Sequence, residues 1–598
     1  MRQAMDSRWY WLLALVLAFG LVLTACGGGG GQTPPDQEQP ADEQAEQPPP
    51  TEEKTVGDVL LYGSIGDASG FNPILVSDTA SDDVSSRIFE GLMEVNDQIE
   101  WVPALAEDWS FSADGTEWTF NLRRDVRWHD GEPFTAEDVA FTFEAIMHPD
   151  YEGVRRTDYD KFVGYAEYDA ALNEISQREE AGELTAEEAR AEKLAAFETW
   201  RQSGAIEIVD DYTIKFRLTE PFAPFQEAIA MNIIPAHVFN GDPGLAGKMD
   251  HPFHTQNPIG TGPYKFVSWS RDEQVVLEAN PDYWGEGPYV GRWVMRVIPD
   301  AQEVTLALET GDLDLGGIQP EEFERMQGVP HLETFEYPTF SYTFMALNLT
   351  MPMFQDVRVR QAITHAIDRE TIVDQLLVGH GTVAHSHGSP ARWDYNPDVP
   401  VFEYNPDRAR ELLAEAGWTD TDGDGILDKD GQPFHFTLQT NQGNKIREDS
   451  AVLIQDYLSQ VGIDVEVEFV EWNTFVNDHL LAKNFEAIIV GWSLGVDPDA
   501  YSIWHTNGGP FNFHSYSNPR VDELLEQGRT ELDQERRKEI YAEFQRILAE
   551  DQAYTFLYFA NSLVGLHQRF EGPISGTPAG IMWNVNEWYV PAANQLRS

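Results

Sequence analysis

Apolar and polar residues alternate in two distinct rhythms after about residue 56, which indicates a chain that mixes strands and helices. Val59–Tyr62 is a short apolar run typical of a buried strand, and Trp118–Leu122 alternates as a half-buried strand does. Thr135 and Asp138 match a capping box, and the segment that they open carries apolar residues at helical spacing (Val139, Phe143 and Ile146). Strands and helices that alternate in this way predict an open α/β architecture.

The same signals continue in the second half of the chain. Asn405 as N-cap, Pro406 in the first turn and Gly417 beyond the end predict a helix of about three turns. Ile463–Phe469 then alternates as a strand.

The segment 151–206 has helical signals, without the strand patterns found on either side of it. Four residues at helical spacing form one apolar stripe: Tyr165, Tyr168, Leu172 and Ile175. Thr185 and Glu188 match a second capping box. We therefore expect an acidic helical hairpin at about residues 155–204, either a structural elaboration or a contact surface for a partner.

The N-terminus has the pattern of an export signal. Arg2 and Arg8 precede the apolar run Trp9–Leu23, which is shorter than the ~20 residues of a membrane-spanning helix. Leu23-Thr24-Ala25-Cys26 follows and contains the only cysteine of the chain. This stretch resembles a lipobox, which predicts removal of residues 1–25 and lipidation of Cys26; the alternative is an incidental cysteine beside an ordinary cleavage site. Residues 26–55 are rich in Gly, Pro, Gln and Glu, and we expect a disordered acidic spacer.

Length and charge narrow the classes of function. A chain of 598 residues predicts two or three lobes, and a single Cys excludes an intrachain disulfide. The formal net charge of −61 repels phosphate backbones, so we expect no nucleic-acid partner.

Catalytic and metal motifs are weak. Asp420–Ile426 begins like a calcium loop, but Gly431 stands where the bidentate Glu belongs, and a solvated turn is the alternative. Two groups of histidines have no spacing typical of a closed metal site: His380, His385 and His387, and His251 and His254. No hydrolase motif is present, so we expect neither an enzyme nor a cofactor.

An ordered series of short motifs resembles the oligopeptide/dipeptide-binding family (family 5) of ABC-transporter extracellular solute-binding lipoproteins. The motifs are Phe89-Glu90-Gly91-Leu92, Pro103–Glu107, Asp114-Gly115-Thr116, Asp130-Gly131, Ala136–Val139, Asn257–Tyr264 and Ala366–Arg369. The resemblance runs from Val59 to the C-terminus, except for the region 151–206, where the family's connection is generally shorter.

The resemblance implies a two-lobed type II periplasmic-binding-protein (Venus-flytrap) fold of the α/β class, with an extra small subdomain in the first lobe. The expected ranges are 56–344 and 558–598 for lobe I, about 78–218 for its small subdomain, and 345–557 for lobe II.

The resemblance also implies which residues face the cleft. Gly491 and Trp492 would reach it from lobe II, Thr79 and Tyr151 from the small subdomain, and Phe344 and Tyr558 from the crossing strands.

In short-peptide binders of the family, an Asp three residues after the Trp holds the ligand's α-ammonium. Gly495 stands at that position here, and Asp497 lies two residues further on. Ile489 replaces a basic residue that some members place three before the Trp. Longer peptides, or a sugar stacked on Trp492 and Trp504, therefore fit better than a dipeptide.

We accordingly expect a monomeric, extracytoplasmic lipoprotein that captures oligopeptides between its lobes and delivers them to the permease and ATPase subunits of an ABC importer. Its contact with the membrane would be the lipid on Cys26, at the outer face of the cell membrane or on the periplasmic side of an outer membrane. The alternatives are an oligosaccharide-binding protein of the same fold, a secreted hydrolase and a sensor that does not transport.

Overall fold

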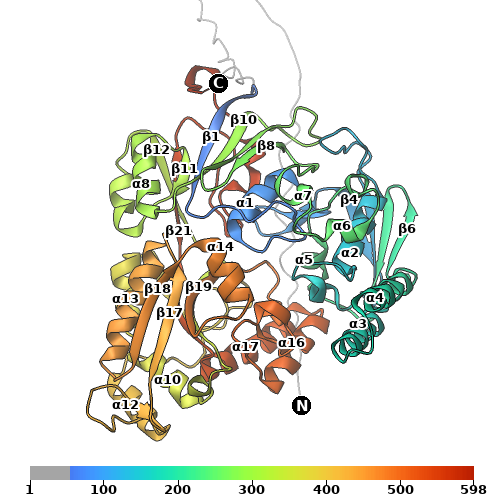
Figure 1. Cartoon of the computed structure of the whole chain (residues 1–598). Coiled ribbons are helices and arrows are strands. Elements are labelled where there is room, and N and C mark those ends of the chain that lie inside the picture. Colours follow the sequence, from blue (N-terminus) through green and yellow to red (C-terminus); the bar gives the residue numbers. More distant parts are fainter. Residues whose placement is uncertain (1–53, 598) are drawn as a thin grey trace, which may run out of the picture. The chain divides into compact units, whose positions relative to one another are not determined.

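The computed structural model describes residues 54–597, which contain two large mixed sheets and a smaller antiparallel sheet (Figure 1). The predicted signal peptide, Cys26 and nearly all of the predicted spacer lie outside the described residues. Lys54, assigned to the spacer by the sequence, instead contacts the folded part, because its Nζ donates to Glu286 at 2.6 Å. Within residues 54–597, no helix combines the length and hydrophobicity that a membrane span requires.

A seven-stranded sheet forms the centre of the first lobe. Its strands in spatial order are β12 (Leu332–Tyr337), β21 (Ser562–His567), β11 (Leu315–Gly317), β1 (Gly57–Ser64), β10 (Val290–Val297), β9 (Gln274–Ala279) and β8 (Tyr264–Ser270). The central strand β1 runs parallel to β10 and β11, and β9 and β8 continue the sheet antiparallel. α8 (Ala301–Thr310) packs against β11.

A four-stranded antiparallel sheet belongs to the same lobe. Its order is β4 (Ala106–Phe111), β5 (Glu117–Leu122), β7 (Thr213–Arg217) and β6 (Ile206–Asp210). α2 (Ala136–Met147) packs on this sheet and begins with the predicted capping box of Thr135 and Asp138. The lobe also contains α1 (Thr79–Ile88), β2 (Met93–Val95), β3 (Trp101–Pro103), α5 (Phe225–Ile229), α6 (Pro243–Ala246), α7 (Pro252–Thr255) and α9 (Phe323–Met326).

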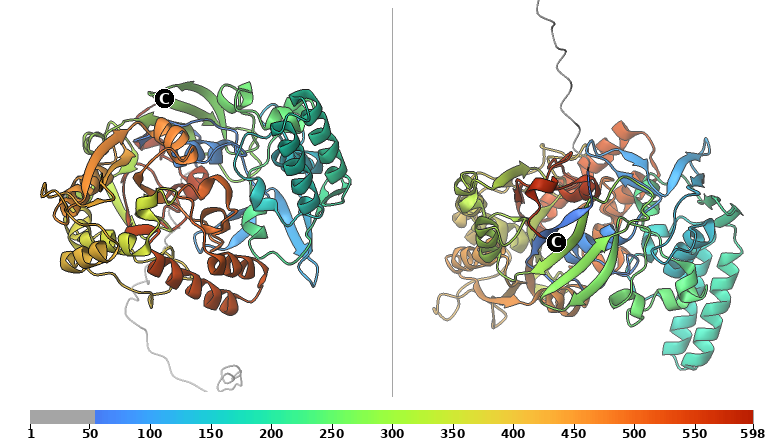
Figure 2. Two further views of the ribbon diagram at one scale, coloured as in Figure 1. Left: turned by 60° about the horizontal axis from the view of Figure 1, so that its bottom comes forward. Right: turned by 90° about the horizontal axis from the view of Figure 1, so that it is seen from above.

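The predicted helical hairpin is present as α3 (Tyr165–Glu180) and α4 (Ala186–Arg201), which lie side by side (Figure 2). The apolar stripe of α3 is buried, and Thr185 and Glu188 form the second capping box.

A six-stranded sheet forms the centre of the second lobe. Its order is β14 (Gly381–Val383), β20 (Tyr554–Ala560), β13 (Tyr342–Leu347), β19 (Ala487–Trp492), β17 (His435–Asn441) and β18 (Asp464–Val470). Helices cover both faces, so every residue of β13 is buried. One face carries α10 (Val357–Ala366), α12 (Pro406–Glu415) and α13 (Lys445–Ser459). The other carries α16 (Pro519–Thr530) and α17 (Gln534–Asp551).

The shorter elements of this lobe are α11 (Arg369–Ile372), α14 (Trp472–Thr474), α15 (Tyr501–Trp504), β15 (Asp428–Lys429) and β16 (Gln432–Pro433). α12 has the predicted cap, since Asn405 accepts a hydrogen bond from the Arg408 N–H.

Two short connections join the large sheets. Residues 338–341 link β12 to β13, and Asn561 links β20 to β21. The chain therefore passes from the first lobe to the second and back within a few residues each time. Phe344 and Tyr558, which the sequence prediction placed at the lobe boundaries, lie inside strands of the six-stranded sheet.

α1 begins at Thr79 because the Asp78 side chain caps it by accepting from the Ser81 N–H. Gly260 and Gly262 pack closely against the end of this helix, because a Cβ on Gly260 would lie 1.8 Å from the Ile88 carbonyl oxygen.

Candidate ligand-binding cleft

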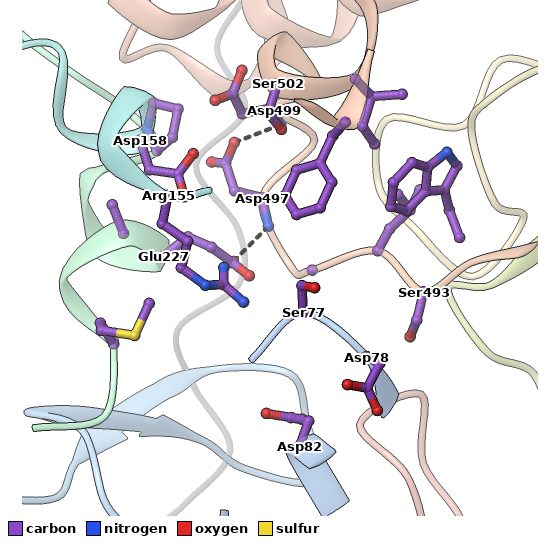
Figure 3. Close-up of a pocket in the computed structure, with 18 of the residues that line it drawn as sticks. Ser77, Asp78, Asp82, Arg155, Asp158, Glu227, Ser493, Asp497, Asp499 and Ser502 are labelled. Atoms are coloured by element: carbon purple, nitrogen blue, oxygen red, sulfur yellow. Dashed lines mark hydrogen bonds between the residues drawn. The ribbon is translucent and has the colours of Figure 1, made fainter. Parts of the chain in front are cut away.

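A cavity of about 580 Å³ lies between the two lobes, in the size range of small-molecule and cofactor sites. The first lobe contributes the N-terminus of α1, the segment around Arg155 and Asp158, and α5 with its flanking residues. The second lobe contributes α14, the end of β19 and the loop that follows it. Figure 3 shows polar side chains from both lobes turned toward this space.

The second-lobe wall is built on the end of β19. Trp492 is the last residue of this strand and is partly buried. Its ring stacks on Phe513, with centroids 5.6 Å apart, and its Nε1 donates to the Tyr554 hydroxyl at 3.4 Å. Trp492 is thus held rigidly by the lobe core while one part of it lines the cavity.

The first-lobe wall is strongly acidic. Asp78 stands at the N-cap of α1 and accepts hydrogen bonds from Ser69 and Ser81. Asp158 has no ion pair within the described residues, and burial raises the pKa of its carboxyl to about 6. Arg155 is the nearest cation to Asp158, and its Nε has no hydrogen-bond partner in the described chain.

Two further carboxylates of the lining, both from the second lobe, already have partners. Asp497 forms a two-point ion pair with Arg537, at 2.7 and 2.8 Å. Asp499 accepts from Arg529 Nε at 2.9 Å. These two acids are therefore neutralised by their own lobe.

Arg529 also joins the two lobes. Its Nη1 donates to Asp160 of the first lobe at 3.0 Å, while its Nε binds Asp499 of the second lobe. The Arg529 side chain is only 3% exposed, and its backbone carbonyl accepts from the Ala223 N–H of the first lobe at 2.8 Å. The lobes are thus in direct contact beside the cavity.

Glu227 on α5 makes a second contact between the lobes. Its Oε2 accepts from the backbone N–H of Asp497 at 3.1 Å, a bond drawn in Figure 3. Burial raises the pKa of Glu227 to about 7, and the nearby Asp497 carboxylate adds to this shift.

Four of the residues predicted from the sequence line this cavity: Thr79, Gly491, Trp492 and Asp497. Asp497 does so with its carboxylate engaged by Arg537. Gly491 is needed for packing, since a Cβ there would lie 2.8 Å from Arg447 Nη2.

The other three predicted residues do not line it. Phe344 is fully buried and stacks on Tyr554, with centroids 3.9 Å apart. Tyr558 is buried beside Thr343, and the Tyr151 hydroxyl donates to the Ile74 carbonyl at 2.6 Å. Each is a packing residue of its lobe, because its side chain points into the core or is bonded to backbone.

The sugar-stacking role of Trp504 was also predicted wrongly. Trp504 is fully buried, and its Nε1 donates to His387 Nδ1 at 3.0 Å. The cavity is instead lined by Trp101, Trp472 and Trp492.

Residues 54–597 contain one cluster of three side chains whose ligand atoms lie close enough together to hold a metal ion. Asp420, Asp422 and Asp424 have carboxylate oxygens within 4.8 Å of one another, and all three are exposed. The loop is closed by its own bonds, because Asp420 accepts from the N–H groups of Gly423 and Gly425. None of the five histidines noted in the sequence belongs to such a group in the described chain.

No motif in the sequence marks Glu227, Asp158 or Arg529 as residues of the cleft. Their neighbours are far away along the chain: Glu227 meets Asp497 across 270 positions, and Arg529 meets Asp160 across 369. A charged residue on a five-residue helix such as α5 has no periodicity that could mark it.

Two lobes joined by two short connections, with a cavity between them, define a binding protein that holds its ligand at a lobe interface. The family model described as "Bacterial extracellular solute-binding proteins, family 5 Middle" matches residues 100–513. The chain therefore belongs to the family 5 bacterial extracellular solute-binding proteins.

Individual relatives support the same family assignment. The chain is 33% identical over 542 residues to the oligopeptide-binding protein AppA of Bacillus subtilis, covering 89% of this chain and 92% of the relative. It is 28% identical to the dipeptide-binding protein of Escherichia coli, covering 83% and 88%. The solved structure of the Bacillus subtilis AppA protein in complex with a nonapeptide superposes with a TM-score of 0.80, covering 90% of this chain and 99% of that one. The predicted family and two-lobed α/β fold are confirmed.

Proposed function

We propose that this protein binds oligopeptides in the cleft between its lobes and delivers them to an ABC importer. The observation that carries the proposal is the interlobe cavity, in a chain that is 33% identical to a protein solved with a nonapeptide. The two connections at residues 338–341 and Asn561 are the natural hinges for opening and closing around a ligand.

The walls fit a peptide. Rings of Trp101, Trp472 and Trp492 offer apolar surface to side chains, and hydroxyls such as those of Ser77 and Ser493 offer hydrogen bonds. The oligosaccharide alternative loses one of its two expected stacking rings, since Trp504 is buried in the core.

Thermal-shift and calorimetric titrations of the full-length protein test the proposal. A nonapeptide library should raise the melting temperature and give saturable binding, whereas an oligosaccharide panel should do neither. Stabilisation by sugars alone would overturn the peptide assignment.

We further propose that the mature chain is a lipoprotein anchored through Cys26, which holds the binding lobes outside the membrane near the permease. The Leu23-Thr24-Ala25-Cys26 pattern supports this proposal. Mass spectrometry of the mature N-terminus should find Cys26 as the first residue with added acyl mass, and Cys26→Ala should abolish that mass. An unmodified thiol on the mature chain would contradict the anchor.

A further inference from the structure

Glu227 reaches across the cleft from the first lobe. It lies on α5, and its carboxylate accepts from the backbone N–H of Asp497, in the loop that follows β19 of the second lobe. No side-chain cation forms an ion pair with Glu227 within residues 54–597, although this acid lines the cavity. The nearby Arg392 is paired with Asp394, and Arg537 with Asp497.

Gly495 makes this position possible. A Cβ added to Gly495 would lie 1.9 Å from Glu227 Oε1 and 2.7 Å from its Cδ. A side chain at position 495 and the observed position of Glu227 therefore exclude one another. The carboxylate of Glu227, from the first lobe, thus occupies the space that a Cβ at position 495 of the second lobe would take.

Acidic side chains outnumber basic ones in the lining of the cavity. Six acidic side chains line it, together with Arg155 and Arg529. Two of these acids, Asp497 and Asp499, have arginine partners. The remaining four acids have no such partner: Asp78, Asp82, Asp158 and Glu227. Arg155 is the one cation of the lining that forms no ion pair in the described chain. Of these four acids, Asp158 and Glu227 are partly buried. An ionised carboxylate that loses water contacts without gaining a counter-charge is destabilised, and a positive group of a ligand would supply that charge.

We propose that Glu227 is the residue that recognises a cationic group of the ligand, an ammonium or a guanidinium, and that it couples this recognition to closure of the lobes. The inference deepens the proposed function and rests on it.

The coupling has a simple physical origin. Glu227 binds the second-lobe loop only when the lobes are together, and in that position its carboxylate is partly buried. A ligand cation beside the carboxylate would restore the lost stabilisation through a charge-assisted hydrogen bond. A ligand without a positive group would leave the acid unpaired in the closed cleft and would bind more weakly.

The positive group can come from the amino terminus of a peptide or from a Lys or Arg side chain. Three nonapeptide libraries separate these sources: one with a free amino terminus and no basic side chains, one N-acetylated with Lys and Arg included, and one N-acetylated without basic residues. Each is titrated calorimetrically into the full-length protein, into Glu227→Gln and into the control Glu535→Gln, which changes an exposed acid on α17.

Wild-type protein and the Glu535→Gln control should bind at least one cationic library about tenfold more tightly than the uncharged one. Glu227→Gln should keep its melting temperature within a few degrees, because the amide still accepts the loop N–H, and should lose most of that preference. The library that wild type prefers identifies the source of the cation.

Equal affinity of wild type for all three libraries, or an unchanged preference in Glu227→Gln, overturns the inference and leaves peptide binding intact. If none of the libraries binds wild type, the proposed function fails and the inference falls with it.

Discussion

The carboxylate of Glu227 fills the space that a side chain on Gly495 would need, because a Cβ there would lie 1.9 Å from Oε1. These two residues belong to different lobes and are far apart in the sequence. From the sequence, Gly495 indicates only that the Asp that holds the ligand's α-ammonium in short-peptide binders is absent from this position. The structure shows that an acid from the opposite lobe stands at this point instead.

Substitution of Gly495 tests this steric relationship. Gly495→Ala should push Glu227 away, break its bond to the Asp497 N–H and weaken peptide binding about tenfold. Calorimetry with a peptide that binds wild type gives the measurement.

Gly317→Ala is the matched control, since a Cβ there meets nothing within 4 Å. It should bind as wild type does. Unchanged binding by Gly495→Ala would show that the cleft tolerates a displaced Glu227.

The Asp160–Arg529–Asp499 contact should make a large contribution to stability. Arg529→Met leaves two partly buried carboxylates without their cation, which is expected to cost about 3–5 kcal/mol. Chemical unfolding followed by fluorescence measures this loss.

Arg520→Met provides the comparison. Arg520 pairs with Glu523 and Glu543 on the surface, where solvent screens the charges, so its removal should cost far less stability than the removal of Arg529. Equal losses for the two variants would mean that burial adds nothing to the interlobe ion pair.

Binding of a ligand with a Lys or Arg side chain should strengthen as the pH rises through 7, because these side chains keep their charge up to pH 8. Burial raises the pKa of Glu227 to about 7 in the ligand-free cleft, so below this pH the carboxyl is mostly protonated. A ligand cation favours the ionised form and lowers that pKa, so binding releases a proton and gains up to about tenfold between pH 6 and pH 8.

Asp158, Asp497 and Arg392 also carry charge near this group, and the pKa of Asp158 is about 6. Asp158→Asn should therefore keep the rise through pH 7, whereas Glu227→Gln should flatten it. A rise that persists in Glu227→Gln would assign the titration to another group.

Substitutions of Trp492 and Trp504 should have different effects on ligand affinity and on stability. Trp504→Ala empties a fully buried site and should cost about 3–5 kcal/mol of stability. Trp492→Ala removes a ring that lines the cavity and should weaken peptide binding with a smaller loss of stability. Thermal unfolding and calorimetry on both variants supply the comparison, and equal effects on binding would contradict the assignment of Trp504 to the core.

Local signals explain why many elements could be predicted. The cap at Asn405, the capping box of α2 and the stripe of α3 depend on residues within a few turns of one another, so the sequence contains all the information.

The cleft could be predicted only in part. Thr79, Gly491 and Trp492, which the family resemblance implies for the cleft, line the interlobe cavity. The chemistry between the lobes, however, depends on pairs such as Glu227 with Asp497 that no local pattern links. Phe344 and Tyr558 were expected to face the cleft because they lie close to the two connections between the lobes. Their strands, β13 and β20, are covered by helices on both faces, so both side chains lie in the core.

Mass spectrometry of the ligand that co-purifies with the full-length protein from its native cell tests the central claim most directly. The account predicts that denaturation releases peptides of several residues carrying a free ammonium or a basic side chain. Release of an oligosaccharide, or of any single compound without a peptide backbone, would contradict it.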